Sequence, residues 1–134
     1  MDTKDKSIVC IGAGNVATHL SKALQQKGFQ LQQVYSRTEE SARTLANTLG
    51  CKWTNQLAQV YEQADVYIVS VKDAVLETVI DQLAHCNPDA LYLHTAGSMP
   101  MEVWKGKQKN YGVAYPMQTF SKQREVRMEE VPFF

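Results

Sequence analysis

The sequence predicts an α/β fold, a doubly wound parallel sheet, and three observations support it. Short apolar runs alternate with amphipathic segments of helical length, a pattern typical of parallel strands joined by crossover helices. A glycine-rich turn at 12–14 directly follows the first apolar run. The length of 134 residues and the hydrophobic content of 44% suit one compact domain.

Two strand–helix units are expected in the first half of the chain. Residues 8–11 are an apolar run, and apolar side chains then recur at helical spacing until Gly28, which tolerates the positive φ of a helix end. Residues 31–35 form the expected second strand. Thr38 stands where an N-cap belongs, and Gly50 ends the second helix.

The second half is expected to continue the alternation of strands and helices. It should add a third strand, a short helix, a buried strand, a third helix, a fifth strand and the end of a sixth, at 51–53, 54–63, 65–71, 73–83, 90–94 and 113–115. Asp73 is the expected N-cap of the third helix. The buried stripe of that helix should consist of Val75, Leu76, Val79, Ile80 and Leu83.

Charge and composition exclude several functional classes. Lys and Arg together number 14, as do Asp and Glu, so the chain has no basic excess for binding nucleic acid. The run at 66–71 is far shorter than the roughly 20 apolar residues that cross a bilayer, so no membrane segment is expected. Cys10, Cys51 and Cys86 form no C-x-x-C pair, which argues against a disulfide framework and a zinc site. We therefore expect no metal, a mature N-terminus and a cytoplasmic location.

The first turn carries the strongest candidate site, because it matches G-x-G-x-x-A between a strand and a helix. Gly12 permits the tight turn, Gly14 lets a pyrophosphate approach the backbone, and Ala17 allows close helix packing. The helix N-terminus favours the anion. The expected dinucleotide-binding residues of this loop are Gly12, Ala13, Gly14, Asn15 and Val16. A purely structural glycine turn is the alternative.

The end of the second strand predicts which dinucleotide binds. An NAD-selective site carries an Asp or Glu there for the ribose 2′-hydroxyl, and this strand end has neither. Ser36, Arg37 and Thr38 instead offer two hydroxyls and a guanidinium, which suit a 2′-phosphate. NADP is therefore the expected cofactor. The alternative is an exposed arginine beside an ordinary N-cap, and the nearby Glu39 and Glu40 count against a phosphate.

The exits of the fourth and fifth strands should face the rest of the dinucleotide, because ligands of doubly wound sheets bind beyond the carboxyl ends of the strands. Lys72 is expected to contact ribose, phosphate or a substrate carboxylate, with a solvated loop lysine as the alternative. His94, helped by Lys72 and Ser98, is expected to orient or protonate the substrate, with a hydrogen-bonded structural histidine as the alternative. The expected cofactor contacts from these exits are Ser70, Val71, Lys72, Thr95, Ala96 and Gly97.

The sequence predicts one domain and a tail. Residues 1–120 should form the NADP-binding Rossmann-like domain, and 121–134 a linker or tail, because apolar periodicity stops after Thr119 and charged residues then cluster. The chain ends in an apolar segment, 131–134, which includes an aromatic pair that is unusual at a free surface terminus.

Six segments of the chain together resemble a known family, and they are 11–17, 36–38, 70–73, 94–98, 115–121 and 132–134. They resemble a bacterial family of oxidoreductases in which a Rossmann-like NADP-binding domain precedes a helical domain of unknown function. More distantly, the chain is similar to pyrroline-5-carboxylate reductase, deazaflavin-dependent NADP reductase and prephenate dehydrogenase. The resemblance implies hydride transfer between NADP(H) and a small imine, keto acid or hydroxy acid, and a homodimer built largely through the helical domain. In that family the chain continues past Phe134, so we expect only half of the substrate pocket here.

Two other functions compete with an oxidoreductase. A non-catalytic NADP-binding or redox-sensing module is favoured by the lack of an unambiguous acid or base. A methyltransferase also uses a glycine-rich first loop, but it would need a carboxylate for the ribose hydroxyls where this chain has Ser36, Arg37 and Thr38.

Overall fold

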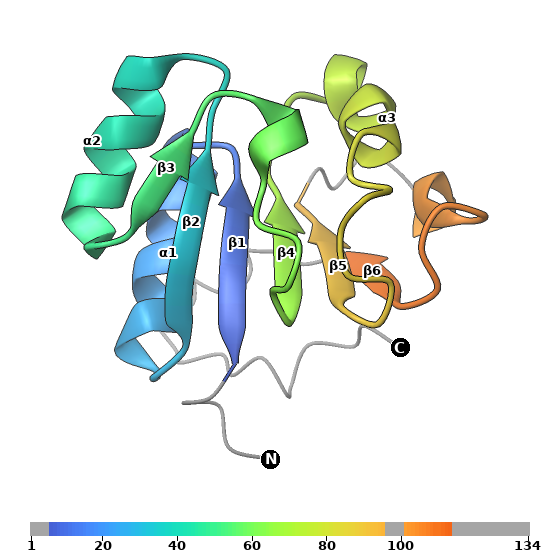
Figure 1. The fold of residues 1–134 in the computed structure, drawn as a ribbon, viewed down its shortest axis with the longest axis horizontal. Helices are drawn as coiled ribbons and strands as arrows, with labels where there is room; N and C mark the ends of the chain where they lie inside the picture. Colours follow the sequence, from blue (N-terminus) through green and yellow to red (C-terminus); the bar gives the residue numbers. More distant parts are fainter. Residues whose placement is uncertain (1–5, 96–100, 114–134) are drawn as a thin grey trace.

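A computed structural model describes residues 6–95 and 101–113 of the chain. Within these ranges, six parallel strands form one sheet in the order β3-β2-β1-β4-β5-β6 (Figure 1). The strands are β1 (Ser7–Ile11), β2 (Gln30–Tyr35), β3 (Lys52–Thr54), β4 (Val66–Val69), β5 (Leu91–His94) and β6 (Tyr111–Val113). The strand order reverses between β1 and β4, so the sheet is doubly wound, which confirms the predicted fold class.

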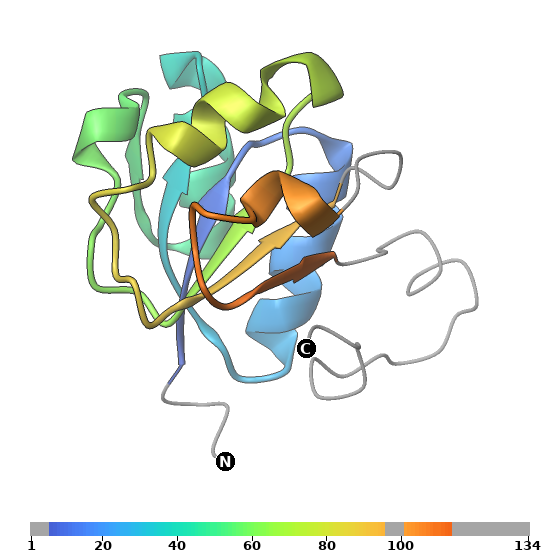
Figure 2. The same ribbon diagram turned by 90° about the vertical axis from the view of Figure 1, so that its right-hand side faces the viewer.

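Helices cover both faces of the sheet, as Figures 1 and 2 show from two sides. They are α1 (Asn15–Gln26), α2 (Glu39–Leu49) and α3 (Asp73–Asp81), with short 3₁₀ turns η2 (Leu57–Gln59) and η3 (Met101–Trp104). Alternate residues of β1 serve the two faces, since Ile8 and Cys10 pack with α1 and α2, whereas Val9 and Ile11 pack with α3 and η3. The core therefore consists of two apolar layers separated by the sheet.

The cap residues of α2 explain why this helix lies where the sequence predicts. The hydroxyl of Thr38 accepts a hydrogen bond from the Ser41 N–H over 3.4 Å, which satisfies one of the unpaired donors at the helix start. Gly50 adopts a left-handed φ of +73° at the other end. Between the caps, the buried stripe consists of Ala42, Leu45, Ala46 and Leu49.

The helix predicted at 54–63 was wrong, because within that range the structure has only the three-residue turn η2. The Thr54 hydroxyl accepts from the Gln56 N–H over 3.2 Å and bends the chain directly after β3. Farther on, the Gln33 side chain of β2 accepts from the Tyr61 N–H over 2.7 Å and donates to the Gln59 carbonyl over 3.3 Å. The backbone bonds inside this segment, such as Gln59 N–H to the Gln56 carbonyl over 2.9 Å, span only three residues, and the Gln33 side chain of the neighbouring strand pairs two further backbone groups.

Three smaller expectations also change. The N-cap of α3 is Lys72 and Asp73 is the first helical residue, so the helix begins one residue earlier than predicted. Val75 is 43% exposed, whereas the other four residues of the predicted stripe are buried, because Val75 lies at the margin of the apolar face. β6 begins at Tyr111, earlier than the predicted strand end at 113–115, and Tyr115 lies outside the described residues.

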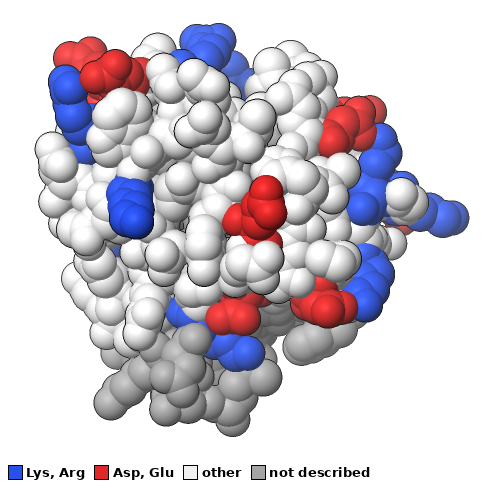
Figure 3. All heavy atoms as spheres, in the orientation of Figure 1, with Lys and Arg blue, Asp and Glu red and all other residues white. Residues whose placement is uncertain are grey.

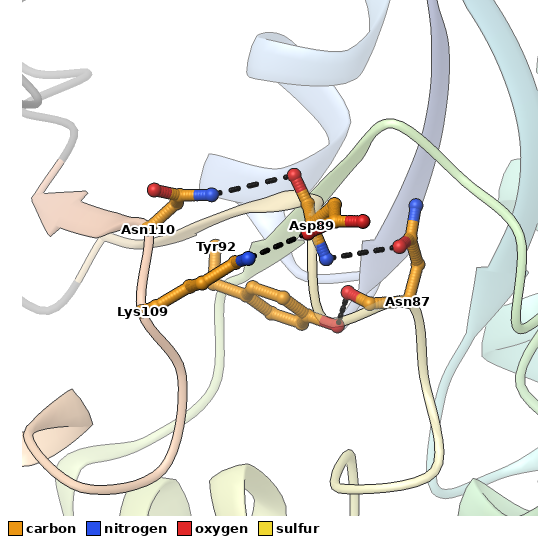
Figure 4. Close-up of polar contacts among 5 residues, drawn as sticks. All are labelled: Asn87, Asp89, Tyr92, Lys109 and Asn110. Atoms are coloured by element: carbon orange, nitrogen blue, oxygen red, sulfur yellow. Dashed lines mark hydrogen bonds and ion pairs between the residues drawn. The ribbon is translucent and has the colours of Figure 1, made fainter.

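The loops at the amino ends of β5 and β6 are joined by a polar cluster (Figure 4). The Tyr92 hydroxyl donates to the Asn87 carbonyl over 2.7 Å, and the Asn87 side chain accepts from the Asp89 N–H over 2.9 Å. Lys109 pairs with the Asp89 carboxylate at 2.6 Å, and the Asn110 side chain donates to the Asp89 carbonyl over 3.4 Å. These contacts fix the amino end of this half of the sheet, opposite the end at which ligands bind.

Surface charge on the face seen in Figure 1 is mixed. Figure 3 shows Lys and Arg interspersed with Asp and Glu on that face, with uncharged surface between them. In the described parts of the chain, no helix has the length and hydropathy needed to cross a bilayer.

Candidate functional site: the carboxyl edge of the sheet

The turn after β1 is packed tightly against the exit of β4. Gly12 has a φ of +120°, and a Cβ at this position would lie 2.2 Å from the Ser70 carbonyl oxygen. The Gly12 N–H also donates to the Tyr35 carbonyl over 2.7 Å, which ties the turn to β2. Both the dihedral angle and the lack of space therefore require glycine at position 12.

Gly14 is in the opposite situation. It is the N-cap of α1 and has an ordinary extended backbone, with φ of −78° and ψ of −168°. A Cβ built on Gly14 would meet no described atom within 4 Å, so open space lies in front of its backbone. The first N–H groups of α1 have no partners within the helix and carry its partial positive charge. This combination of open space and N–H donors fits a pyrophosphate group.

The exit of β2 presents the predicted 2′-phosphate residues. The Ser36 N–H donates to the Thr54 carbonyl over 3.2 Å, which fixes the strand end while the Ser36 side chain is half-buried. Arg37 is exposed and forms no ion pair with any residue in the described ranges. Glu39, which the sequence suggested would oppose a phosphate, pairs with Arg43 at 3.0 Å one helical turn away. The guanidinium of Arg37 is therefore available to an anion.

Thr38 serves mainly the helix cap. Besides accepting from the Ser41 N–H, its hydroxyl donates to the Ser41 hydroxyl over 2.9 Å. Because the Thr38 hydroxyl hydrogen is used in this bond, the hydroxyl hydrogen available to a ligand is that of Ser41. Ser41 was not among the predicted site residues, although its position three residues after an N-cap threonine indicates that the two side chains meet.

The exits of β4 and β5 bring Ser70, Val71, Lys72 and Thr95 to the same edge. The Thr95 hydroxyl donates to the Ser70 hydroxyl over 2.9 Å, and both residues are partly exposed. Lys72 is exposed, whereas Val71 packs partly against the core under α3. The predicted contacts Ala96 and Gly97, and the helper Ser98, lie outside the described residues.

His94 points into the core rather than toward this edge. It is fully buried on the face covered by α3 and η3, and its Nδ1 accepts a hydrogen bond from Trp104 Nε1 over 2.9 Å. This geometry favours the structural alternative, and the catalytic role of His94 stays a prediction. Trp104 itself was missed, because η3 is too short to give a periodic sequence signal.

The cysteines are not arranged for thiolate chemistry at neutral pH. Burial raises the pKa of the Cys10 thiol to about 12 and that of the Cys51 and Cys86 thiols to about 11. All three are free thiols. They therefore contribute apolar packing rather than a nucleophile.

Comparison with known proteins agrees with this geometry. Residues 7–96 match the family described as NADP oxidoreductase, coenzyme F420-dependent. The solved structure of a protein assigned as an NADP oxidoreductase from Bacteroides fragilis is 54% identical in sequence, with a TM-score of 0.83. The match covers 99% of this chain and 52% of that one, so the chain spans about half the length of this relative. No curated protein sequence gave a significant match.

Two more distant structures share the fold alone. Arogenate dehydrogenase from Synechocystis is 16% identical with a TM-score of 0.62, over 75% of this chain and 38% of that one. The WlbA dehydrogenase from Chromobacterium violaceum, solved with NADH, is 14% identical with a TM-score of 0.67, over 85% and 36%.

Proposed function

Because this chain belongs to the NADP oxidoreductase, coenzyme F420-dependent family, we propose that it is the cofactor domain of an enzyme that transfers hydride between NADP(H) and a small molecule. The substrate class we propose is an imine, a keto acid or a hydroxy acid. In an imine or a keto acid, the carbon polarised by the neighbouring nitrogen or oxygen accepts hydride from NADPH, and the nitrogen or oxygen takes up a proton. A hydroxy acid reacts in the opposite direction, because its carbon gives hydride to NADP+ and its hydroxyl releases a proton.

The contrast between Gly12 and Gly14 carries the proposal. Gly12 is required by the fold, because a side chain there would collide with Ser70. Gly14 is not required by the fold, because its dihedral angles suit any residue and a Cβ would enter open space. A group that approaches the Gly14 backbone closely explains why glycine stands there, and a pyrophosphate at the start of α1 is such a group.

NADP rather than NAD is proposed on the charges at the exit of β2. The residues that follow this strand are Ser36, Arg37 and Thr38, and a carboxylate that would repel a 2′-phosphate is missing among them. Arg37 is exposed and can form a bidentate pair with the phosphate. The ion pair of Glu39 with Arg43 reduces the repulsion that Glu39 would otherwise exert.

The nicotinamide end is proposed to extend over β4 and β5. These strands lie on the other side of β1 from β2, so a dinucleotide anchored at Gly14 and Arg37 spans the point where the strand order reverses. Lys72, exposed at the start of α3, is proposed to bind a carboxylate or phosphate of the bound molecules. The homodimer and the cytoplasmic location stay predictions.

A non-catalytic NADP-binding or redox-sensing module is the second candidate. The observation that favours it is the burial of His94, the residue predicted to exchange a proton with substrate. Such a module would bind NADP(H) at the same glycine turn without turnover.

Thermal unfolding of the chain with NADP, NADPH, NAD and S-adenosylmethionine tests the proposal. A ligand that binds only the folded state stabilises it by about 2.7 kcal/mol at a concentration of 100 Kd. We expect the largest rise in melting temperature with NADP or NADPH. A rise with S-adenosylmethionine alone would indicate a methyltransferase, and no rise with any dinucleotide would refute both NADP-based candidates.

A further inference from the structure

Two hydroxyl groups meet across the carboxyl ends of β4 and β5. Val69 pairs with His94 in the sheet, so Ser70 and Thr95 are the next residues along the two strands. The Thr95 N–H donates to the Val69 carbonyl over 3.1 Å, which continues the ladder by one hydrogen bond. Beyond it, Thr95 Oγ1 donates to Ser70 Oγ over 2.9 Å. Because both residues are partly exposed, this pair lies at the open edge of the sheet rather than in the core.

The backbone of Ser70 is held from the other side by β1. Its N–H donates to the Ile11 carbonyl over 2.7 Å, and its own carbonyl lies against the Gly12 turn, where a Cβ would come within 2.2 Å. Ser70 therefore stands between the glycine turn and Thr95, beside the reversal of strand order. Because the Ser70 backbone is fixed in this way, the direction of the Ser70 hydroxyl depends on the hydrogen bonds that Ser70 Oγ makes.

The bond from Thr95 fixes that direction. A hydroxyl has one hydrogen and two lone pairs, and Thr95 uses one lone pair of Ser70 Oγ. The Ser70 hydrogen must then point away from Thr95, and no residue in the described ranges accepts it. A ligand oxygen above the carboxyl edge is a suitable acceptor.

We propose that Thr95 is a positioning residue that orients the Ser70 hydroxyl to donate a hydrogen bond to the nicotinamide half of NADP(H). The acceptor is an oxygen of the nicotinamide ribose or of the adjoining phosphate. The adenosine half is proposed to lie by Arg37, which follows β2, and β2 lies on the far side of β1 from β4. This inference rests on the proposed function, and it assigns Thr95 an indirect role instead of a contact with the cofactor.

The test compares two ligands on one pair of variants. Thr95→Val keeps the branched shape and removes the hydroxyl, whereas Thr95→Ser keeps the hydroxyl. We expect Thr95→Val to weaken NADPH binding by roughly 3–10-fold, the effect of one neutral hydrogen bond, in isothermal titration calorimetry. Binding of adenosine 2′,5′-bisphosphate, which lacks the nicotinamide half, should not change. Thr95→Ser should bind NADPH as the original chain does.

A double-mutant cycle separates an indirect role from a direct one. Ser70→Ala should weaken NADPH binding to a similar extent as Thr95→Val, and Thr95→Val should add no further loss in the Ser70→Ala background. Additive losses would mean that Thr95 contacts the cofactor itself and would overturn the proposal. Equal weakening of both ligands, or failure of Thr95→Ser to restore binding, would show a merely structural role.

Failure of this inference can be told apart from failure of the proposed function. If the unmodified chain binds neither NADPH nor adenosine 2′,5′-bisphosphate, the proposed function fails and this inference fails with it. If the unmodified chain binds NADPH and Thr95→Val binds it equally well, only the role of Thr95 is refuted. Urea midpoints of all variants, measured in parallel, identify any that fail to fold. The conservative Thr95→Ser variant then still decides whether the hydroxyl matters.

Discussion

Glycine is required at position 12 by the fold and is proposed to be required at position 14 by the cofactor, and this difference can be measured. We predict that Gly14→Val abolishes NADPH binding and leaves a cooperative thermal transition, because the new side chain fills only the open space in front of α1. Gly12→Ala is the matched control. It should lower the free energy of unfolding by about 1–3 kcal/mol, because alanine is strained at positive φ. The collision of its Cβ with the Ser70 carbonyl oxygen should add to this loss. Normal NADPH binding by Gly14→Val would leave the glycine turn with a structural role alone.

The hydrogen bond between His94 and Trp104 gives a second prediction at the scale of single residues. His94→Phe leaves the buried Trp104 N–H without its acceptor, which costs about 1–3 kcal/mol of stability. We expect urea unfolding to show this loss while the Kd for NADPH stays unchanged. Trp104→Phe, which removes the donor, is the companion variant. A His94→Phe variant with full stability and weakened cofactor binding would restore His94 to the site.

The sequence was most informative about single residues where local chemistry decides the outcome. The Thr38 cap depends on the nearby Ser41, and the Gly12 turn depends on the positive φ of Gly12 itself, so both roles could be predicted. The partner of His94 could not, because Trp104 reaches it from a separate 3₁₀ turn packed on the sheet. The same holds for the Ser70–Thr95 pair, which depends on strand register.

At the scale of elements, prediction succeeded where helices carry both caps and a clear apolar stripe. α2 has both and was located within one residue. The helix prediction at 54–63 failed because the Gln33 side chain of β2 pairs with the backbone of this segment. Such a contact between elements leaves no trace in the spacing of apolar residues. α3 began one residue early because the extended Lys72 takes the cap position.

The central strands β1, β4 and β5 predict how stability depends on alkaline pH. Burial raises the pKa of Cys10 in β1 to about 12, and it also raises the pKa of Tyr67 in β4 and Tyr92 in β5. The ordinary values are about 8.5 for cysteine and about 10 for tyrosine. A raised pKa means that the folded state holds the proton more tightly, so this stability is present below the ordinary value and is lost as pH rises toward the folded value.

We therefore expect the urea midpoint to be constant near neutral pH and to fall from about pH 9 upward. The variant Cys10→Ala should start from a lower midpoint, because it removes buried atoms, but it should fall less steeply between about pH 9 and 12. An identical slope for the two proteins would show that the Cys10 thiol is not the group that titrates.

At the scale of the whole molecule, the chain is expected to bind cofactor but to lack turnover by itself, because it spans only part of the length of its relative. It spans 52% of the Bacteroides fragilis relative, and His94 is buried. We predict that the 134-residue chain binds NADP(H) but does not oxidise NADPH when imines or keto acids are added. The loss of NADPH absorbance measures this oxidation. A longer protein that includes the remainder found in relatives is the comparison. Turnover by the short chain would contradict this prediction and would direct mutagenesis first to Lys72.

The central claim is that the carboxyl edge of this sheet binds NADP(H) and that Arg37 recognises the 2′-phosphate. The most direct measurement is the Kd of NADPH and of NADH for the unmodified chain and for Arg37→Ala, with Lys22→Ala on the exposed surface of α1 as the control. We predict tighter binding of NADPH than of NADH, a loss of roughly 10–100-fold for NADPH in Arg37→Ala, and little change for NADH. Equal weakening of both dinucleotides, or a preference for NADH in the unmodified chain, would contradict the account.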